Sequence, residues 1–256
     1  MAAVIAQVLA RNAYEYPSDF TARATRAAQT LLPAVLTLNR LADRLGRDAN
    51  AQDTSWRGGL SGLIHRRCRL APAHGDARNW PAPEPTTHPS IAPVESVSLA
   101  RTNSRGWELI RCTAVVRQAG LAWESGVRVV HDLARRTTAS ARTPGVAVPA
   151  SALPPIRMLT LNAGDLCAWA RATADNNPIH LHAGAALNAG MAVEEDEIVA
   201  HGLLLGAVSL ALVPAAGTVD LRLTGAVRLP LNGTAALCAH TDGSLTAGGS
   251  GVLARR

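Results

Sequence analysis

The sequence predicts an α+β fold made of two tandem units, each with a long apolar helix followed by the strands of an antiparallel sheet. Two observations support this prediction. The same order of elements occurs in both halves of the chain, and each helical stretch precedes runs in which apolar residues alternate. The 256 residues are enough for two domains of ordinary size. We expect the units to span residues 1–145 and 146–256, because a polar stretch that ends in the turn signal Pro144-Gly145 separates them.

The first unit should contain one central helix and four strands. Pro33 is expected to open the helix and Gly46 to close it, with leucines spaced between them for one buried face. The proline-rich residues 81–93 predict an exposed loop, because proline fits neither a helix interior nor a central strand. The strands are expected near residues 63–70, 94–102, 107–117 and 121–131.

The second unit should contain a short helix, a central helix and a meander. Thr160 or Asn162 is placed to cap the short helix, which carries Leu166 and Trp169 on one side. Residues 203–213 are apolar nearly all round, as expected for a helix that the fold encloses. Strands are expected near residues 221–229, 234–241 and 244–254, with turns at Asn232-Gly233 and Asp242-Gly243.

A similar phrase occurs once in each half. Arg69-Leu70 is followed by Pro72 and a glycine turn, and Arg228-Leu229-Pro230 is followed by a glycine turn as well. We interpret the phrase as a trace of duplication. A long helix followed by an antiparallel meander is the order of elements in the hot-dog fold, in which the sheet wraps the helix. Two tandem copies would form a double hot-dog, in which each copy covers sheet surface that the other leaves open.

The composition argues against several classes of function. The formal charge of +6 is compatible with nucleic-acid binding, but the chain has no lysine, its arginines are scattered, and only 3% of its residues are aromatic. We therefore expect a solvated basic surface, and the sequence leaves open a contact of some arginines with the phosphates of a nucleotide-bearing substrate. The four cysteines form no CxxC pair, so neither a zinc site nor a disulfide framework is predicted.

The sequence also predicts no membrane span. Its longest apolar run ends at Pro214 and is far shorter than the roughly 20 residues that a span requires. The first residues have no basic segment before their short apolar run, so we do not expect them to be a signal peptide. We expect a cytoplasmic protein.

The strongest functional signal lies between Asp175 and His180, in the order Asp-Asn-Asn-Pro-Ile-His. The proline stiffens a loop of turn-forming residues, which places a carboxylate and an imidazole near one small volume. A second block, Ile198 to Gly202, puts a His-Gly step directly before the apolar helix. Each residue alone has an ordinary explanation, such as a cap, a loop tie or a buried histidine. The joint pattern instead indicates acid/base chemistry beside a helix N-terminus.

These two blocks resemble the signature of the MaoC-like (R)-specific enoyl-thioester hydratases. The family pattern is Asp, any residue, Asn, Pro, an aliphatic residue and His, and this chain matches it between Asp175 and His180. The resemblance covers about residues 156–240. The first half is similar, more weakly, to the degenerate copy in actinobacterial double hot-dog dehydratases. It has no such motif, so one active site per chain is expected, with the first half as a wall.

The resemblance implies a hydro-lyase that interconverts (R)-3-hydroxyacyl and trans-2-enoyl thioesters in fatty-acid metabolism. It assigns the acid/base pair to Asp175 and His180, and we assign the oxyanion donor to Gly202. Asn177, His201 and Ser209 are candidates for contact with substrate, although Ser209 also suits helix packing and His201 suits orientation of the loop. No metal or organic cofactor is required. The expected partner is an acyl-CoA or acyl-carrier-protein thioester, and the sequence leaves a homodimer open.

Two rival functions remain open at this point. One is a non-catalytic subunit that binds acyl thioesters, and the other is a thioesterase on the same fold. The chain also departs from the family pattern in one place. Where an acidic residue often follows two positions after the catalytic histidine, this chain has His182. The acidic residues 194–197 are interpreted as a solvated turn.

Overall fold

The computed structural model describes residues 1–11, 19–48, 60–73, 94–117, 126–137 and 153–255. We call the part up to residue 137 the N-terminal half and the part from residue 153 the C-terminal half. The N-terminal half contains α1 (Ala2–Arg11), α2 (Phe20–Asp48), β1 (Ile64–Pro72), β2 (Val94–Ser104), β3 (Trp107–Val116) and β4 (Val127–Arg136). The C-terminal half contains β5 (Pro155–Asn162), α3 (Ala163–Thr173), the 3₁₀ helix η4 (Pro178–His180), α4 (Ala185–Asn188), β6 (Glu197–Val199), α5 (Gly202–Leu212), β7 (Val219–Leu223), β8 (Arg228–Pro230), β9 (Thr234–His240), β10 (Leu245–Ala247) and β11 (Ser250–Arg255).

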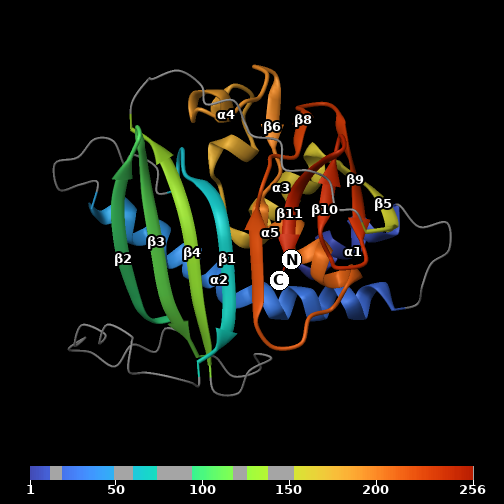
Figure 1. Ribbon diagram of the computed structural model, residues 1–256, viewed down its shortest axis with the longest axis horizontal. Coiled ribbons are helices and arrows are strands. Elements are labelled where there is room, and N and C mark those ends of the chain that lie inside the picture. The colour runs from blue at the N-terminus through green and yellow to red at the C-terminus, as the bar shows by residue number, and fades with distance from the viewer. Residues whose placement is uncertain (12–18, 49–59, 74–93, 118–125, 138–152, 256) are drawn as a thin grey trace.

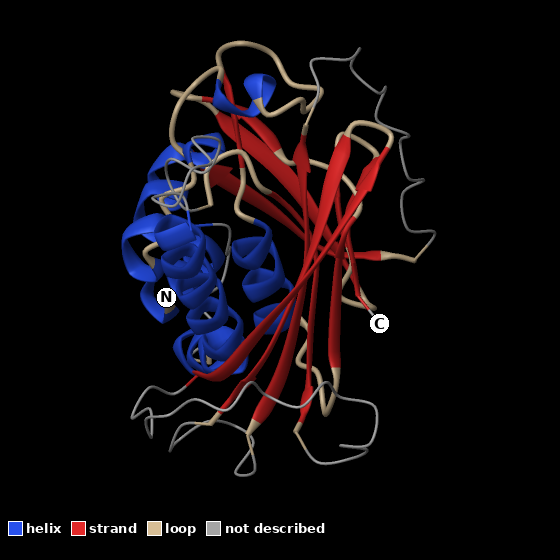
Figure 2. Cartoon of the chain, turned by 90° about the vertical axis from the view of Figure 1, so that its left-hand side faces the viewer, coloured by secondary structure: helices blue, strands red, loops and turns tan. Residues whose placement is uncertain are grey.

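One antiparallel sheet runs through both halves. Its nine strands lie in the order β2-β3-β4-β1-β7-β11-β10-β9-β5, and β6 and β8 form a separate two-stranded sheet. The halves meet where β1 pairs with β7, with Cys68 opposite Leu221 and Leu70 opposite Val219. The strands of the N-terminal half therefore lie beside those of the C-terminal half without a break (Figure 1). Figure 2 shows that the helices gather on one face of this sheet.

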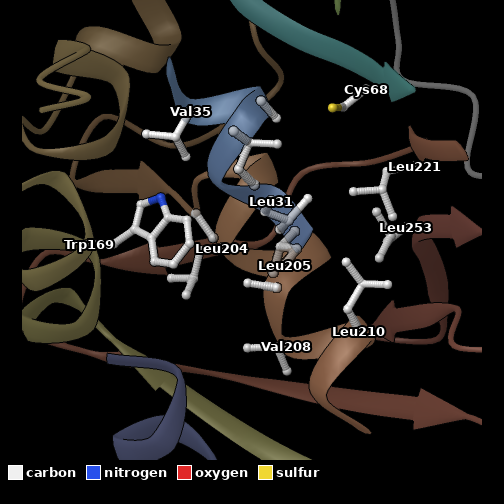
Figure 3. Packing of buried hydrophobic residues seen from close by; sticks show 14 of the residues in the cluster. Leu31, Val35, Cys68, Trp169, Leu204, Leu205, Val208, Leu210, Leu221 and Leu253 are labelled. Carbon is white, nitrogen blue, oxygen red and sulfur yellow. The ribbon is translucent and has the colours of Figure 1, made fainter. Parts of the chain in front are cut away.

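The two long apolar helices form the centre of the core. Helix α2 crosses behind the strands of both halves in Figure 1 and packs against α5. In Figure 3, Leu31 of α2 lies among Leu204 and Leu205 of α5, with Leu221 and Leu253 of the sheet beside them. Burial of these side chains is the main contribution to the stability of the fold. Within the described ranges, no helix is both long and apolar enough to cross a membrane.

The predicted boundaries of the first central helix are wrong. Helix α2 starts at Phe20, thirteen residues before Pro33, and continues past Gly46 to Asp48. Proline inside a helix removes the hydrogen bond to the carbonyl four residues earlier. Here that residue is Gln29, which is exposed, so its carbonyl can be hydrated. The packing of the helix on α5 and the sheet outweighs this local cost.

Three strand predictions also need correction. The strand expected at 121–131 is β4, at Val127–Arg136, so it includes the first residues of the stretch that we expected to be a linker. The strand expected at 221–229 is two strands, β7 and β8, in different sheets. The strand expected at 244–254 is interrupted at Gly248 and Gly249, whose positive φ angles of 55° and 74° make a tight turn between β10 and β11. The predicted linker centre and proline loop lie outside the described residues.

The duplicated phrase does not mark equivalent positions. Arg69 to Pro72 lies in β1, at the centre of the large sheet, whereas Arg228 to Pro230 is the whole of β8 in the small sheet. The two halves still repeat an arrangement, because each places a long helix against antiparallel strands. This is the α+β architecture that the order of elements predicted, although the phrase itself is not evidence for it.

Candidate active site

Helix α3 carries the chain to the loop that contains the predicted acid/base pair. The Asn162 side chain accepts a hydrogen bond from Asp165 N at 3.0 Å, and the Asp165 carboxylate accepts one from Asn162 N at 3.0 Å, so Asn162 caps the helix as predicted. Arg11 of α1 donates two hydrogen bonds to the same carboxylate, at 2.6 and 2.7 Å. The helix ends at Ala174, whose left-handed backbone (φ 56°, ψ 21°) turns the chain into the loop.

The loop is fixed by its own side chains and by the N-terminal half. Asn177 N donates to Asp175 Oδ1 at 3.3 Å, and Asn177 Oδ1 accepts from Ile179 N at 3.5 Å, where η4 begins. The side-chain amide of Asn177 also donates to Leu63 O at 2.8 Å, just before β1. Asn177 therefore fastens the loop to a segment 114 residues earlier in the chain. This bond holds Asp175 and His180 at the junction of the two halves.

His180 is held in one tautomer. Its Nδ1 lies 2.7 Å from Val199 O, and a carbonyl can only accept, so Nδ1 carries the proton and Nε2 is left with a lone pair. Burial lowers the pKa of His180, while the nearby Asp175 carboxylate and the bond to Val199 O oppose this shift. The neutral imidazole is therefore favoured at neutral pH, and its Nε2 can accept a proton.

His201 stacks on this imidazole and is tied to the same loop. The ring centroids of His180 and His201 are 3.8 Å apart at an interplanar angle of 27°. His201 Nε2 donates to Asp175 O at 3.3 Å. Burial, and the proximity of His180, lower the pKa of His201 well below its usual value. The geometry gives His201 contacts with both members of the pair, as expected of a residue that orients the loop.

The side chains of Asp175 and His180 lie close together, as the loop pattern predicted. One carboxylate oxygen of Asp175 and one ring nitrogen each of His180 and His201 all lie within 4.8 Å of one another. A carboxylate with two imidazoles also has the ligand types of a metal site. A second grouping with such ligand types consists of His65, Cys68 and His131. In that grouping burial raises the pKa of the Cys68 thiol, which favours the protonated, weakly ligating form.

Two cavities meet at His180. The larger has a volume of about 510 Å³ and is lined from both halves, by Trp107 and Leu109 on one side and by Met191 and Leu205 on the other. The smaller has a volume of about 20 Å³ and is lined by Asp175, Asn177, His180 and several leucines. Three residues line both cavities: His65, His180 and Gly202.

Gly202 is the first residue of α5, and its backbone comes very close to the sheet. A β-carbon added there would lie 2.2 Å from Leu223 Cδ1. A larger residue at this position would obstruct the approach of a ligand to the Gly202 N–H. The structure adds a second effect, because Leu223 must also move. The first N–H groups of a helix have no partner within the helix, so the N–H of Gly202 is of the kind that binds an anionic oxygen.

The remaining candidates lie away from the pair. Ser209 is fully buried and donates to Gly243 O at 2.6 Å, and it lines neither of the two cavities. This places it in helix packing rather than at the site. His182 is exposed, and residues 194–196 of the acidic loop are exposed as well.

Sequence reasoning missed the residues that the N-terminal half brings to the site. His65, Arg66 and Arg105 all line the larger cavity. Arg105 lies in the turn between β2 and β3 with a φ of 48°, and its position at the cavity was not predicted. His65 stands at the start of β1 and follows no motif. It reaches the site because β1 pairs with β7.

Similarity to solved structures identifies the fold of this chain. No protein-family model and no curated protein matches the sequence. Two crystal structures of HtdX (Rv0241c) from Mycobacterium tuberculosis are similar to this chain, with 18% identity over 90% of it. The TM-scores of the two alignments are 0.53 and 0.51, and the alignments cover 93% and 94% of the HtdX chains.

A larger protein is also similar. Full-length peroxisomal multifunctional enzyme type 2 from Drosophila melanogaster aligns with 99% of this chain at 15% identity and a TM-score of 0.50, and the alignment covers 44% of that protein. The chain has a double hot-dog fold. This fold class is the one that the sequence predicted, and it is the fold that the resemblance to MaoC-like hydratases implied.

Proposed function

We propose that the chain is a hydro-lyase that interconverts (R)-3-hydroxyacyl thioesters and trans-2-enoyl thioesters. The observation that carries this proposal is the convergence of Asp175 and His180 in a cavity that the N-terminus of α5 also lines. A hydratase needs a base for water, an acid for the α-carbon and a donor for the thioester oxygen. These three requirements correspond to the groups that meet here. The stereochemistry follows from the resemblance alone.

In the proposed reaction His180 Nε2 removes a proton from water as the water oxygen bonds to the β-carbon. The electron pair of the double bond moves toward the thioester carbonyl. The imidazolium, stabilised by the Asp175 carboxylate, then returns a proton to the α-carbon, so that one water has been added in total. The neutral tautomer of His180, with its lone pair on Nε2, supports this role as a base.

Negative charge on the thioester oxygen would be stabilised by the N–H of Gly202. A donor at a helix N-terminus is oriented before the reaction begins, so it costs no reorganisation. Gly202 lines the larger cavity as well as the smaller one, which places its backbone between the space for an acyl thioester and the acid/base pair.

The substrate is proposed to be an acyl-CoA or acyl-carrier-protein thioester. The cavity of about 510 Å³ is of a size that accepts a small ligand or part of a larger one, and much of its lining is apolar, as an acyl chain requires. The exposed side chains of Arg66 and Arg105 line it too, and guanidinium groups suit the phosphates that such carriers have. In this proposal residues 146–256 form the catalytic unit, and residues 1–145 complete the slot.

The test is product analysis with purified protein on crotonyl, octenoyl and longer trans-2-enoyl thioesters. Hydration removes the enoyl absorbance and leaves the thioester intact, so no free thiol appears. Release of free thiol would instead identify a thioesterase. Binding of the thioesters without any turnover would identify a non-catalytic acyl-thioester-binding subunit. The His180→Ala protein serves as the control for uncatalysed hydration, because it lacks the proposed base.

A further inference from the structure

Of the ionisable side chains that the described N-terminal half brings to the larger cavity, His65 is the one that also lines the smaller cavity. His65 of β1 lines the larger cavity and the smaller one, and His180 and Gly202 are the other residues that line both. The 20 Å³ cavity therefore has histidines from both halves in its wall. The motif between Asp175 and His180 does not predict a histidine at this position.

A chain of hydrogen bonds fixes which nitrogen of His65 carries a proton. His131 Nε2 lies 3.1 Å from Ala34 O, so it must donate, and the Nδ1 of the neutral ring is then an acceptor. Burial lowers the pKa of His131 well below its usual value, which keeps the ring neutral. His65 Nε2 lies 3.0 Å from His131 Nδ1 and 2.9 Å from Arg67 O. Since both neighbours only accept, His65 carries its proton on Nε2.

This arrangement leaves Nδ1 of His65 as a hydrogen-bond acceptor. Among the described residues, none donates to it or accepts from it. Burial lowers the pKa of His65 to about 4, with a further lowering contribution from His180, so the ring is neutral at neutral pH. Two hydrogen bonds of Nε2 fix the ring, and Nδ1 carries the lone pair.

The smaller cavity has the size of one water molecule. A volume of about 10–15 Å³ is enough for a water, which needs two to four polar partners in a protein interior. The cavity measures about 20 Å³, and the polar residues in its wall are His65, Asp175, Asn177 and His180. The rest of its wall is made of leucines and Gly202. A water here would lie beside the base and next to the space for the acyl thioester.

We propose that His65 Nδ1 holds the reacting water by accepting a hydrogen bond from it. The inference rests on the proposed hydratase function. Hydration sends one hydrogen of the water to the base and leaves the other on the oxygen, which becomes the 3-hydroxyl. His180 Nε2 receives the first hydrogen, and His65 Nδ1 accepts the hydrogen bond of the second before and after the oxygen–carbon bond forms. With both hydrogens engaged, a lone pair of the oxygen is free to face the β-carbon.

The role has a direct chemical consequence for the two halves. The N-terminal half is more than a wall in this proposal, because its His65 touches the reacting molecule. His131 acts through His65 and is a positioning residue, since it selects the tautomer in which Nδ1 is unprotonated. In the dehydration direction the same nitrogen would accept from the 3-hydroxyl of the substrate.

The test compares His65→Phe and His65→Ala with the parent protein and with His240→Phe. His240 is a buried histidine outside the site that bonds Leu153 O and Thr246 Oγ1, so its replacement reports the cost of losing any such group. We expect kcat for hydration to fall on the order of tenfold in both His65 variants, the loss that one hydrogen bond represents. KM should change by no more than about threefold, and added imidazole should restore part of the activity of His65→Ala but not of His65→Phe.

A measurement on the parent protein is independent of folding in the variants. Long-range ¹H–¹⁵N correlation should show His65 with a proton on Nε2 and none on Nδ1 at neutral pH. A proton on Nδ1 would overturn the inference and leave the hydratase proposal standing. So would folded His65 variants that keep the parent kcat, or that lose no more than His240→Phe. A parent protein that hydrates no enoyl thioester would overturn both proposals together.

Discussion

Each half of the molecule has a pair of contacting histidines, one of which lines both cavities, and the two pairs are linked in different ways. The rings of His180 and His201 in the C-terminal half stack, with centroids 3.8 Å apart at 27°, and each is bonded to a backbone carbonyl. The rings of His65 and His131 in the N-terminal half are tilted by 56°, and a hydrogen bond of 3.0 Å joins them directly.

The difference concerns what each pair can do with a proton. Stacking does not engage the ring nitrogens, so His180 can gain and lose a proton on Nε2 while Nδ1 stays on Val199 O. The direct bond between His65 and His131 selects one tautomer, because a proton on His131 Nδ1 would face the N–H of His65 Nε2. The C-terminal pair is thus suited to proton transfer and the N-terminal pair to holding a fixed acceptor. The predictions below test this division between the halves.

The largest effect is expected from separating the halves. Residues 146–256 expressed alone should be insoluble or inactive, because α5 would lose its packing on α2 and β7 would lose its partner β1. Both losses expose apolar surface and an unpaired strand edge. Solubility, circular dichroism and thioester turnover of the fragment are the measurements. A folded and fully active fragment would show that the first half is dispensable, and adding residues 1–145 as a separate chain is the matched control.

The next largest effect should come from the acid/base pair itself. Asp175→Asn and His180→Ala should each lower kcat on the order of a hundredfold or more, because each removes half of the pair. The fold should persist, since the Asn177 bond to Leu63 O still holds the loop. His182→Ala removes an exposed histidine two residues from His180 and should keep the parent kcat. Near-normal kinetics in a folded Asp175 or His180 variant would exclude the assignment.

The C-terminal half of this site could be predicted from sequence because its signals are local. Asp175 and His180 are five residues apart across a proline, and the cap at Asn162 depends on a residue three positions later. The N-terminal contribution could not be predicted in this way. His65 reaches the site because β1 pairs with β7 and because Asn177 bonds Leu63 O, and neither contact leaves a mark in the nearby sequence.

The same distinction explains the errors in the fold. Alternation of apolar residues predicted that strands exist between 219 and 255, but not that β8 leaves the large sheet for β6. Pro33 is a local signal for a helix start, and packing of α2 against α5 overrides it. The fold class and the order of a helix followed by strands in each half were predictable, whereas α1, β5, the register and the long-range contacts were not.

A smaller effect should separate two roles of Gly202. Gly202→Val should lower both stability and turnover, because its β-carbon would collide with Leu223. In a Leu223→Ala background that collision is removed, so stability should recover. We expect turnover to remain about tenfold below that of Leu223→Ala alone, since the added side chain still obstructs the oxyanion donor. Thermal unfolding and kcat of the four proteins are the measurements. Full recovery of kcat in the double variant would mean that Gly202 only makes room for Leu223.

The smallest effect is expected in the acid stability of the two histidine pairs. Burial lowers the pKa of all four rings, that of His65 to about 4. Histidine in an unfolded chain titrates near 6.5, so between these values the unfolded state binds more protons than the folded one. Stability is therefore fully present above about pH 6.5 and falls as the pH is lowered toward 4. The unfolding temperature should fall over this range.

Variants can show which half causes the fall in stability between pH 6.5 and 4. His65→Phe and His180→Phe each remove one histidine that must stay neutral in the folded state, so each should flatten the fall in stability between pH 6.5 and 4. Asp220→Asn is the matched control. Burial raises the pKa of Asp220, but the bond to Arg67 outweighs this effect and lowers the pKa from its ordinary value of 3.8. Asp220 therefore affects the pH dependence of stability only below about pH 4. Urea unfolding midpoints at several pH values give the comparison. An unchanged slope in His65→Phe would mean that the N-terminal ring is not held neutral, and its part in the water site would fall with that result.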